Sequence, residues 1–201
     1  MTAPAGAQAP FTPQGSPRLG TADLCAVADL GDEARALLDK GAPPPKDFIE
    51  RLVAANLHAD AVRFLAHALP RRECVWWAWV CARKVAGAEP PLAIKNALDA
   101  TERWIVQPTE DHRRQALVFG EAADFGTPAG CAALAAFMSG GSLAPPEAPA
   151  VPPGEFMTAK AVSGSVTLSA VATEPERAAE KFAEFVSLGL EVADRTRLWI
   201  T

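Results

Sequence analysis

The sequence contains no tyrosine, and aromatic residues make up only 7% of its 201 positions. It also has no run of about 20 consecutive apolar residues, which excludes a membrane-spanning helix. The 19 Lys and Arg residues are outnumbered by 24 Asp and Glu, which gives a net charge of −5. Such a chain offers no basic surface for a nucleic-acid backbone or an anionic membrane. We therefore expect neither nucleic acid nor a membrane span among its partners.

Motifs that carry chemistry are missing as well. The cysteines form no CxxC or CxxH spacing, so a structural zinc site is not predicted, and each thiol is expected to be a small buried apolar residue. The three histidines match neither HExxH nor a two-histidine, one-carboxylate pattern. No GxSxG nucleophile motif occurs. We expect no metal, no cofactor and no catalytic residue. The cysteines concerned are Cys25, Cys74, Cys81 and Cys131.

The first 20 residues are rich in Pro, Ala and Gly and have almost no charge. They lack the basic and apolar regions of a signal peptide, so we expect a cytoplasmic protein. Their composition predicts a disordered leader. Residues 21–201 are expected to form a single helical domain, because a chain of this length buries one substantial core.

Alanine dominates what is present, at 42 of the 201 positions. Alanine is the best helix former and is depleted in strands. Apolar residues recur at helical spacing in segments that are separated by helix-breaking Pro and Gly residues. This pattern predicts an all-α, irregular multi-helix bundle of about eight or nine helices. The expected helices cover about 22–39 with a break near Gly31, 46–56, 57–69, 70–86, 90–107, 109–124, 127–139, 155–172 and 173–199.

Several helix starts carry recognisable caps. Thr109 and Thr127 are expected N-caps, and Thr173 with Glu176 matches a capping box. Residues 155–172 are ambiguous, since their β-branched residues also suit a strand. Because no partner strand is expected elsewhere, we predict a helix there.

Residues 139–154, SGGSLAPPEAPAVPPG, contain five prolines and three glycines. They predict a Pro-rich loop between the last helices, either an ordered wrap across the surface or a flexible loop. The glycines follow a helix rather than precede one. This order favours a helix C-cap and loop entry over a phosphate site.

The most unusual feature is an Arg-Arg-Glu triplet followed by three tryptophans within four positions. On a helix these tryptophans cannot all point the same way, so at least one faces a second helix, solvent or a partner. Trp and Arg dominate binding hot spots. The structural alternative is that the tryptophans fill the core and the glutamate pairs with a neighbouring arginine, and we expect core packing with one Trp at the surface. The candidate interaction residues are Arg72, Glu73, Trp76, Trp77 and Trp79.

Residues 61–83, together with the later turn at 139–142, resemble the signature of an uncharacterised bacterial all-helical domain family with an LP-x-RE-x-x-WWA block. The resemblance covers roughly residues 45–195. It implies a domain of unknown function, encoded in some members near type VI secretion components, and it supplies no catalytic residue. The matching residues are Leu69, Pro70, Arg72, Glu73, Trp76, Trp77 and Ala78, with Ser139 to Ser142.

Three classes of function stay open on this evidence. The first is a non-catalytic protein–protein interaction, scaffolding or accessory protein with an unidentified protein partner, for example in a bacterial secretion system. The second is a small-molecule or lipid binding module with a Trp-lined pocket. The third is an enzyme that uses Glu73, Arg72 and His67, which lie within two helical turns of one another. Broad apolar faces on several helices also allow a homo-oligomer.

Overall fold

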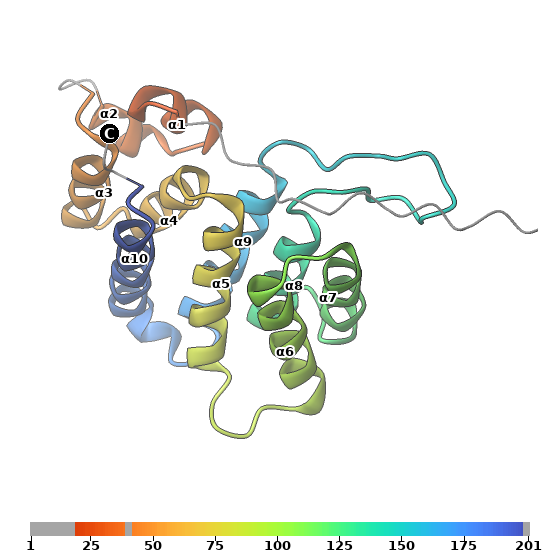
Figure 1. The fold of residues 1–201 in the computed structure, drawn as a ribbon. Coiled ribbons are helices and arrows are strands. Elements are labelled where there is room, and N and C mark those ends of the chain that lie inside the picture. Colours follow the sequence, from red (N-terminus) through yellow and green to blue (C-terminus); the bar gives the residue numbers. More distant parts are fainter. Residues whose placement is uncertain (1–18, 39–41, 199–201) are drawn as a thin grey trace, which may run out of the picture.

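The computed structural model describes residues 19–38 and 42–198, and within these ranges it contains helices, turns and loops but no strand (Figure 1). The predicted all-α class is therefore confirmed. The expected disordered leader lies, except for its last two residues, outside the described residues. The helices are α1 (Thr21–Val27), α2 (Asp32–Ala36), α3 (Pro45–Ala54), α4 (His58–Ala68), α5 (Arg71–Val85), α6 (Leu92–Val106), α7 (Glu110–Ala122), α8 (Pro128–Phe137), α9 (Met157–Val171) and α10 (Ala178–Arg195), with a 3-10 turn, η1, at Pro175–Arg177.

The described ranges hold ten α-helices, and the first expected helix accounts for the difference, since it is divided into α1 and α2. Asp29 adopts a left-handed conformation with φ of 50° between them. The backbone N–H of Gly31 donates to the Asp60 carboxylate at 2.9 Å, which fixes the start of α2 against α4. The predicted break near Gly31 is thus confirmed, and a contact distant in sequence holds it.

The local caps of α7 and α8 are confirmed. The Thr109 hydroxyl accepts the backbone N–H of His112 at 3.2 Å, and the Thr127 hydroxyl accepts that of Gly130 at 3.1 Å. The expected helix over residues 155–172 is present as α9.

The predicted capping box at Thr173 is wrong. Its hydroxyl accepts a hydrogen bond from the Lys181 ammonium at 2.9 Å, and it caps no helix N–H. Glu174 takes a left-handed conformation, with φ of 42°, and η1 precedes α10. The last helix therefore begins at Ala178 and ends at Arg195, while its expected end at Trp199 lies outside the described residues.

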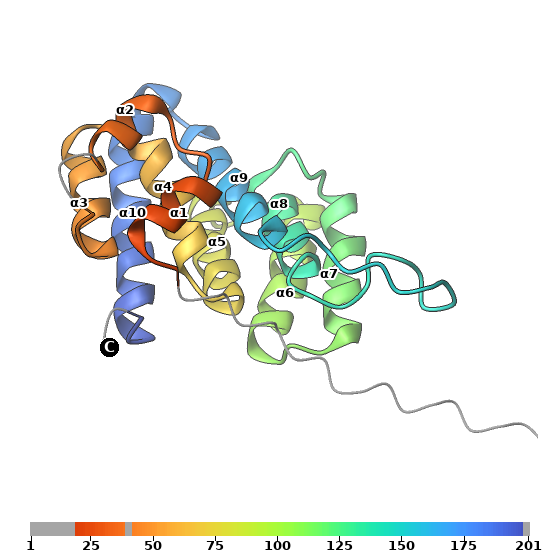
Figure 2. The same ribbon diagram turned by 90° about the horizontal axis from the view of Figure 1, so that it is seen from above.

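The core is built around α8 and α9. Helix α8 packs against α5, α6, α7 and α9, and α9 also contacts α4 and α10. In Figures 1 and 2, α6, α7 and α8 lie on one side, α1 to α4 and α10 on the other, and α5 and α9 between them. Small side chains let α8 contact four neighbours closely. Its buried alanines are Ala129, Ala132, Ala133, Ala135 and Ala136.

Trp77 fills the core where α5 meets α10. It is completely buried, and its indole N–H donates to the Phe185 carbonyl at 2.7 Å. Gly189 of α10 packs directly on it, since a Cβ at that position would lie 2.7 Å from Trp77 Cε2 and 2.6 Å from Leu65 Cδ2. The small residue thus brings α10 close to the Trp-rich helix.

The cysteines are all buried and form no disulfide, as predicted. Burial raises the pKa of the Cys25 and Cys131 thiols to about 11. Burial raises the pKa of Cys74 and Cys81 further. At neutral pH these thiols are protonated and therefore poor nucleophiles. None of the helices in the described ranges has the length and apolar character needed to cross a membrane.

Candidate functional site

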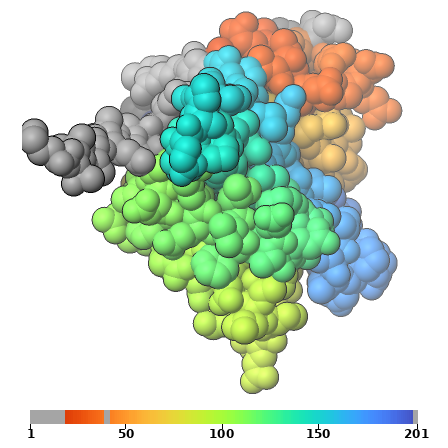
Figure 3. All heavy atoms as spheres, turned by 90° about the vertical axis from the view of Figure 1, so that its right-hand side faces the viewer, coloured from red at the N-terminus to blue at the C-terminus, as the bar shows by residue number. Residues whose placement is uncertain are grey.

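The Pro-rich loop between α8 and α9 stands away from the helical bundle. In Figures 1 and 2 it leaves the end of α8, extends past α7 and returns to α9, and in Figure 3 it faces the viewer as a knob. Residues 145–152 are exposed. The predicted loop is confirmed as irregular structure, but it projects from the bundle instead of wrapping across it. We call residues 143–151 the arm.

The arm consists of an outgoing limb, which starts at Leu143, and a return limb, which ends at Val151. The two limbs are joined at the neck, where Ser142 and Leu143 lie against Val151. The backbone N–H of Leu143 donates to the Val151 carbonyl at 2.8 Å. The Ser142 hydroxyl accepts the N–H of Val151 at 3.0 Å and that of Ala144 at 3.1 Å. The Ser142 hydroxyl therefore bonds to both limbs, and two hydrogen bonds, Leu143 to Val151 and Val151 to Ser142, close the neck.

A β-turn forms the tip of the arm. The N–H of Ala148 donates to the Pro145 carbonyl at 3.0 Å, which places Pro146 and Glu147 at the two central positions. Proline suits the first of these because its ring fixes φ near the value that the turn needs. The return limb then carries Pro149. The arm is thus closed at its neck and turned at its tip by hydrogen bonds.

Arg113 of α7 anchors the outgoing limb. Its side chain is completely buried, and its Nε and Nη2 both donate to the Glu110 carboxylate at 2.7 Å. Nη1 donates to the Phe137 carbonyl at 2.6 Å, and Nη2 to the Ser142 carbonyl at 2.8 Å. Gly141 has φ of 66°, and a Cβ there would lie 2.9 Å from the guanidinium. The second glycine of the SGGS turn is therefore required by this contact.

Arg114 extends the same cluster. Its Nε donates to Glu110 at 2.7 Å, and its Nη2 donates to the Ala144 carbonyl at 3.0 Å. Burial alone would raise the pKa of Glu110, but hydrogen bonds and charge from Arg113 and Arg114 outweigh it and hold that pKa below its usual range. The carboxylate is ionised at neutral pH and orients both arginines toward the arm.

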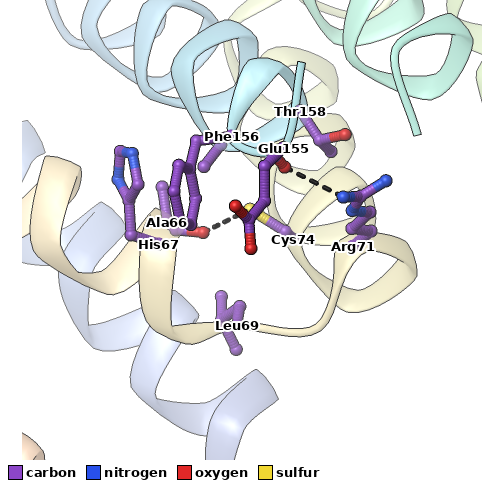
Figure 4. A pocket seen from close by; sticks show the side chains of 9 residues that line it. Ala66, His67, Leu69, Arg71, Cys74, Glu155, Phe156 and Thr158 are labelled. Atoms are coloured by element: carbon purple, nitrogen blue, oxygen red, sulfur yellow. Dashed lines mark hydrogen bonds between the residues drawn. The ribbon is translucent and has the colours of Figure 1, made fainter. Parts of the chain in front are cut away.

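Arg71, the first residue of α5, joins the two ends of the whole loop. Its Nη1 donates to the Ser139 carbonyl at 3.0 Å. Its Nη2 donates to the Glu155 carbonyl at 2.9 Å (Figure 4). The residue is buried, with 6% of its surface exposed. Burial lowers the pKa of Arg71, and the Glu155 carboxylate opposes that effect. The loop therefore begins and ends on one guanidinium.

A cavity of about 10 Å³ lies beside this contact and includes His67 and Phe156 in its lining (Figure 4). His67 Nδ1 lies 2.7 Å from the Arg63 carbonyl, and its buried Nε2 has no hydrogen-bond partner. Burial lowers the pKa of His67, so the imidazole is neutral at pH 7. The cavity has room for about one water molecule and none for a metabolite.

In the part of the chain that the structure describes, no hydrogen bond or ion pair joins the residues of the enzyme hypothesis. The Arg72 side chain is exposed and donates to the Ile105 carbonyl at 2.6 Å and the Val106 carbonyl at 3.2 Å, which caps the end of α6. Glu73 forms no ion pair within the described ranges, so the predicted pairing with a neighbouring arginine is wrong. Neither residue lines the cavity that His67 faces.

The three clustered tryptophans point to different surroundings. Trp77 is in the core, and Trp79 is half-buried with its indole N–H donating to the Leu98 carbonyl of α6 at 3.0 Å. Trp76 is half-buried beside a hollow of about 110 Å³, which we call the Trp76 groove. The expectation was core packing with one Trp at the surface, whereas Trp77 alone is fully buried and two tryptophans are partly exposed. The groove is lined by Trp76, Trp77 and Val80 of α5 and by Leu188, Glu191, Val192 and Arg195 of α10.

Sequence reasoning missed the two buried arginines, Arg71 and Arg113. A lone arginine is usually exposed, so its residue type gives no sign of burial. The one available signal was the spacing of Glu110 and Arg113, which places opposite charges on the same helix face. The carbonyls that both arginines bind come from a distant loop, and no helical spacing predicts them.

Comparison with known protein families matches residues 48–193 to a family of unknown function (DUF6931). The chain belongs to this family. The match agrees with the resemblance to an uncharacterised family, and the matched range contains the arm and both buried arginines. No curated protein matches the chain. No solved structure matches it either.

Proposed function

We propose that this family member is a non-catalytic interaction protein that presents the arm to a protein partner. The observation that carries the proposal is the contrast between the exposed tip and its buried base. Taking an arginine out of water is costly unless it is fully bonded, and here Arg71 and Arg113 bond the two ends of one loop. Helix–helix connections are usually about 2–8 residues long, so residues 138–156 far exceed what joining α8 to α9 requires.

The chemistry of the tip suits recognition by another protein. Proline rings are apolar, and a loop that is already ordered loses little conformational entropy on binding. Pro-rich segments are commonly bound on aromatic-lined surfaces. The tip therefore offers apolar contact and free carbonyls at a low entropic cost.

The role we propose is that of a cytoplasmic scaffold or accessory protein in a bacterial multiprotein system, for example type VI secretion. The support is the resemblance of residues 61–83 to the LP-x-RE-x-x-WWA block. The cysteines, which are buried and free of disulfides, fit a reducing compartment.

The two alternatives have weaker support. A pocket for a drug-sized molecule is usually about 300–1,000 Å³, whereas the Trp76 groove measures about 110 Å³. For an enzyme, Arg72 and Glu73 do not line the cavity that His67 lines. Neither alternative accounts for the anchored arm.

Photo-cross-linking tests the proposal. Pro146 is replaced by a photoreactive phenylalanine in the native cells, and Val118, an exposed residue of α7, receives the same change as a matched control. We expect irradiation to give protein adducts from position 146 and few from position 118, detected by gel shift and identified by mass spectrometry. Adducts that are absent, or equally abundant at both positions, would contradict a recognition role for the arm.

A further inference from the structure

The Trp76 groove carries a cation beside its aromatic wall. The guanidinium of Arg195 lies 5.9 Å from the centre of the Trp76 ring. Arg195 is exposed and forms no ion pair within the described ranges. An indole face next to an available guanidinium favours an apolar ligand that also carries a negative charge.

The arm has the complementary chemistry. Glu147 is its one charged residue, with Pro146 before it and Pro149 two positions after it. Glu147 is exposed, and no ion pair involves it in the part of the chain that the structure describes. The arm therefore presents a carboxylate between proline rings, which matches the guanidinium beside the indole.

We propose that the arm of one copy of this protein binds in the Trp76 groove of a second copy, with Glu147 next to Arg195 and a proline ring against Trp76. This inference rests on the proposed recognition role of the arm and names its partner. In Figures 1 and 2 the arm stands on the α7 side of the bundle and α10 on the other side, so the arm points away from the groove of its own chain.

Binding between copies has a consequence for assembly. The arm and the groove are different surfaces, so a reciprocal exchange gives a dimer and a one-way exchange gives a longer chain or a ring. In both cases the average mass rises with protein concentration. Glu191 also lines the groove, and its charge repels Glu147, so E191Q is expected to strengthen the association.

Charge reversal tests the contact through light scattering and sedimentation over a wide concentration range. E147R and R195E are each expected to raise the dissociation constant about tenfold, because each replaces an attraction by a repulsion of similar size. The double variant E147R/R195E restores opposite charges and is expected to recover association. E121R is the matched control, since it makes the same charge change at an exposed position of α7.

A wild-type protein that stays monomeric at every concentration would overturn the inference, as would a double variant that associates no better than either single one. Cross-linking from position 146 then separates this inference from the proposed function. Adducts on α10 of a second, isotope-labelled copy support both. Adducts on a different protein contradict the inference and leave the proposed function standing, whereas no adducts contradict both.

Discussion

Gly189 sets how closely α10 approaches α4 and α5. Leu65 and Trp77 occupy the space that a side chain at this position would need. The indole N–H of Trp77 donates to the carbonyl of Phe185, one turn before Gly189 on the same helix. At this position the packing surface of α10 is its backbone. Any added atom must displace Leu65 or Trp77, both of which are completely buried.

We expect G189A to lower the free energy of unfolding by about 1–3 kcal/mol, because the added methyl group overpacks a filled core. Urea unfolding measures the change. S187A is the control, since Ser187 is exposed on the same helix. Equal stability of G189A and S187A would show that α10 can shift without cost.

The sequence predicted that the two cysteines of α5 are buried, but not what the polar side chains of this helix bind. Cys74 and Cys81 are buried, as their residue type predicts, and Trp77 is buried as well. Arg72 lies on an exposed face, where its partners are the last carbonyls of α6. Those partners are distant in sequence, so residue type and local spacing contain no information about them.

At the scale of the element, local interactions were predictable and distant ones were not. The caps at Thr109 and Thr127 need only residues within the first turn of each helix, and both form. The residues at Thr173 and Glu176 match a capping box, but the Thr173 hydroxyl accepts a hydrogen bond from Lys181 instead of from a helix N–H. Glu174 also takes a left-handed conformation, so the backbone that follows Thr173 does not continue directly into the helix.

The first turn of α7 also predicts a pH dependence. Because the pKa of Glu110 is lower in the folded protein than in the unfolded chain, the unfolded chain binds protons first as the pH falls. The stability that Glu110 provides is fully present at neutral pH and is lost as the pH falls below about 4.5. We expect E110Q to be less stable at pH 7 and to show a smaller loss between about pH 5 and pH 3.

Chemical denaturation at a series of pH values measures this difference. E121Q, a change at an exposed glutamate of the same helix, is the control and should keep the wild-type profile. If E110Q lost stability on acidification as steeply as the wild type, Glu110 would not be the group that responds.

At the scale of the whole molecule, the alanine content and the positions of Pro and Gly were enough to predict an all-α bundle with an irregular loop. Both properties determine local backbone conformation, so they can be read directly from the sequence. The hydrogen bonds that attach the arm to the bundle could not be predicted from composition or from Pro and Gly positions. The base of the arm joins side chains of α5 and α7 to carbonyls that lie 24 to 84 positions away. Such contacts exist only once the bundle has formed.

The tip of the arm is expected to contribute little to folding. We predict that replacing residues 144–150 by Asn-Gly, which joins Leu143 to Val151 through a short turn, changes the free energy of unfolding by less than about 1 kcal/mol. Thermal and urea unfolding check this. A large loss of stability would show that the tip supports the bundle, and would argue against its role in recognition.

The Arg71 contact has a consequence for sequence change within the loop. Because one guanidinium holds the carbonyls of Ser139 and Glu155, the ends of the loop keep their separation whatever lies between them. Backbone carbonyls are present in every residue, so this attachment does not depend on the side chains of the loop. The bundle is therefore suited to display foreign peptides between residues 144 and 150.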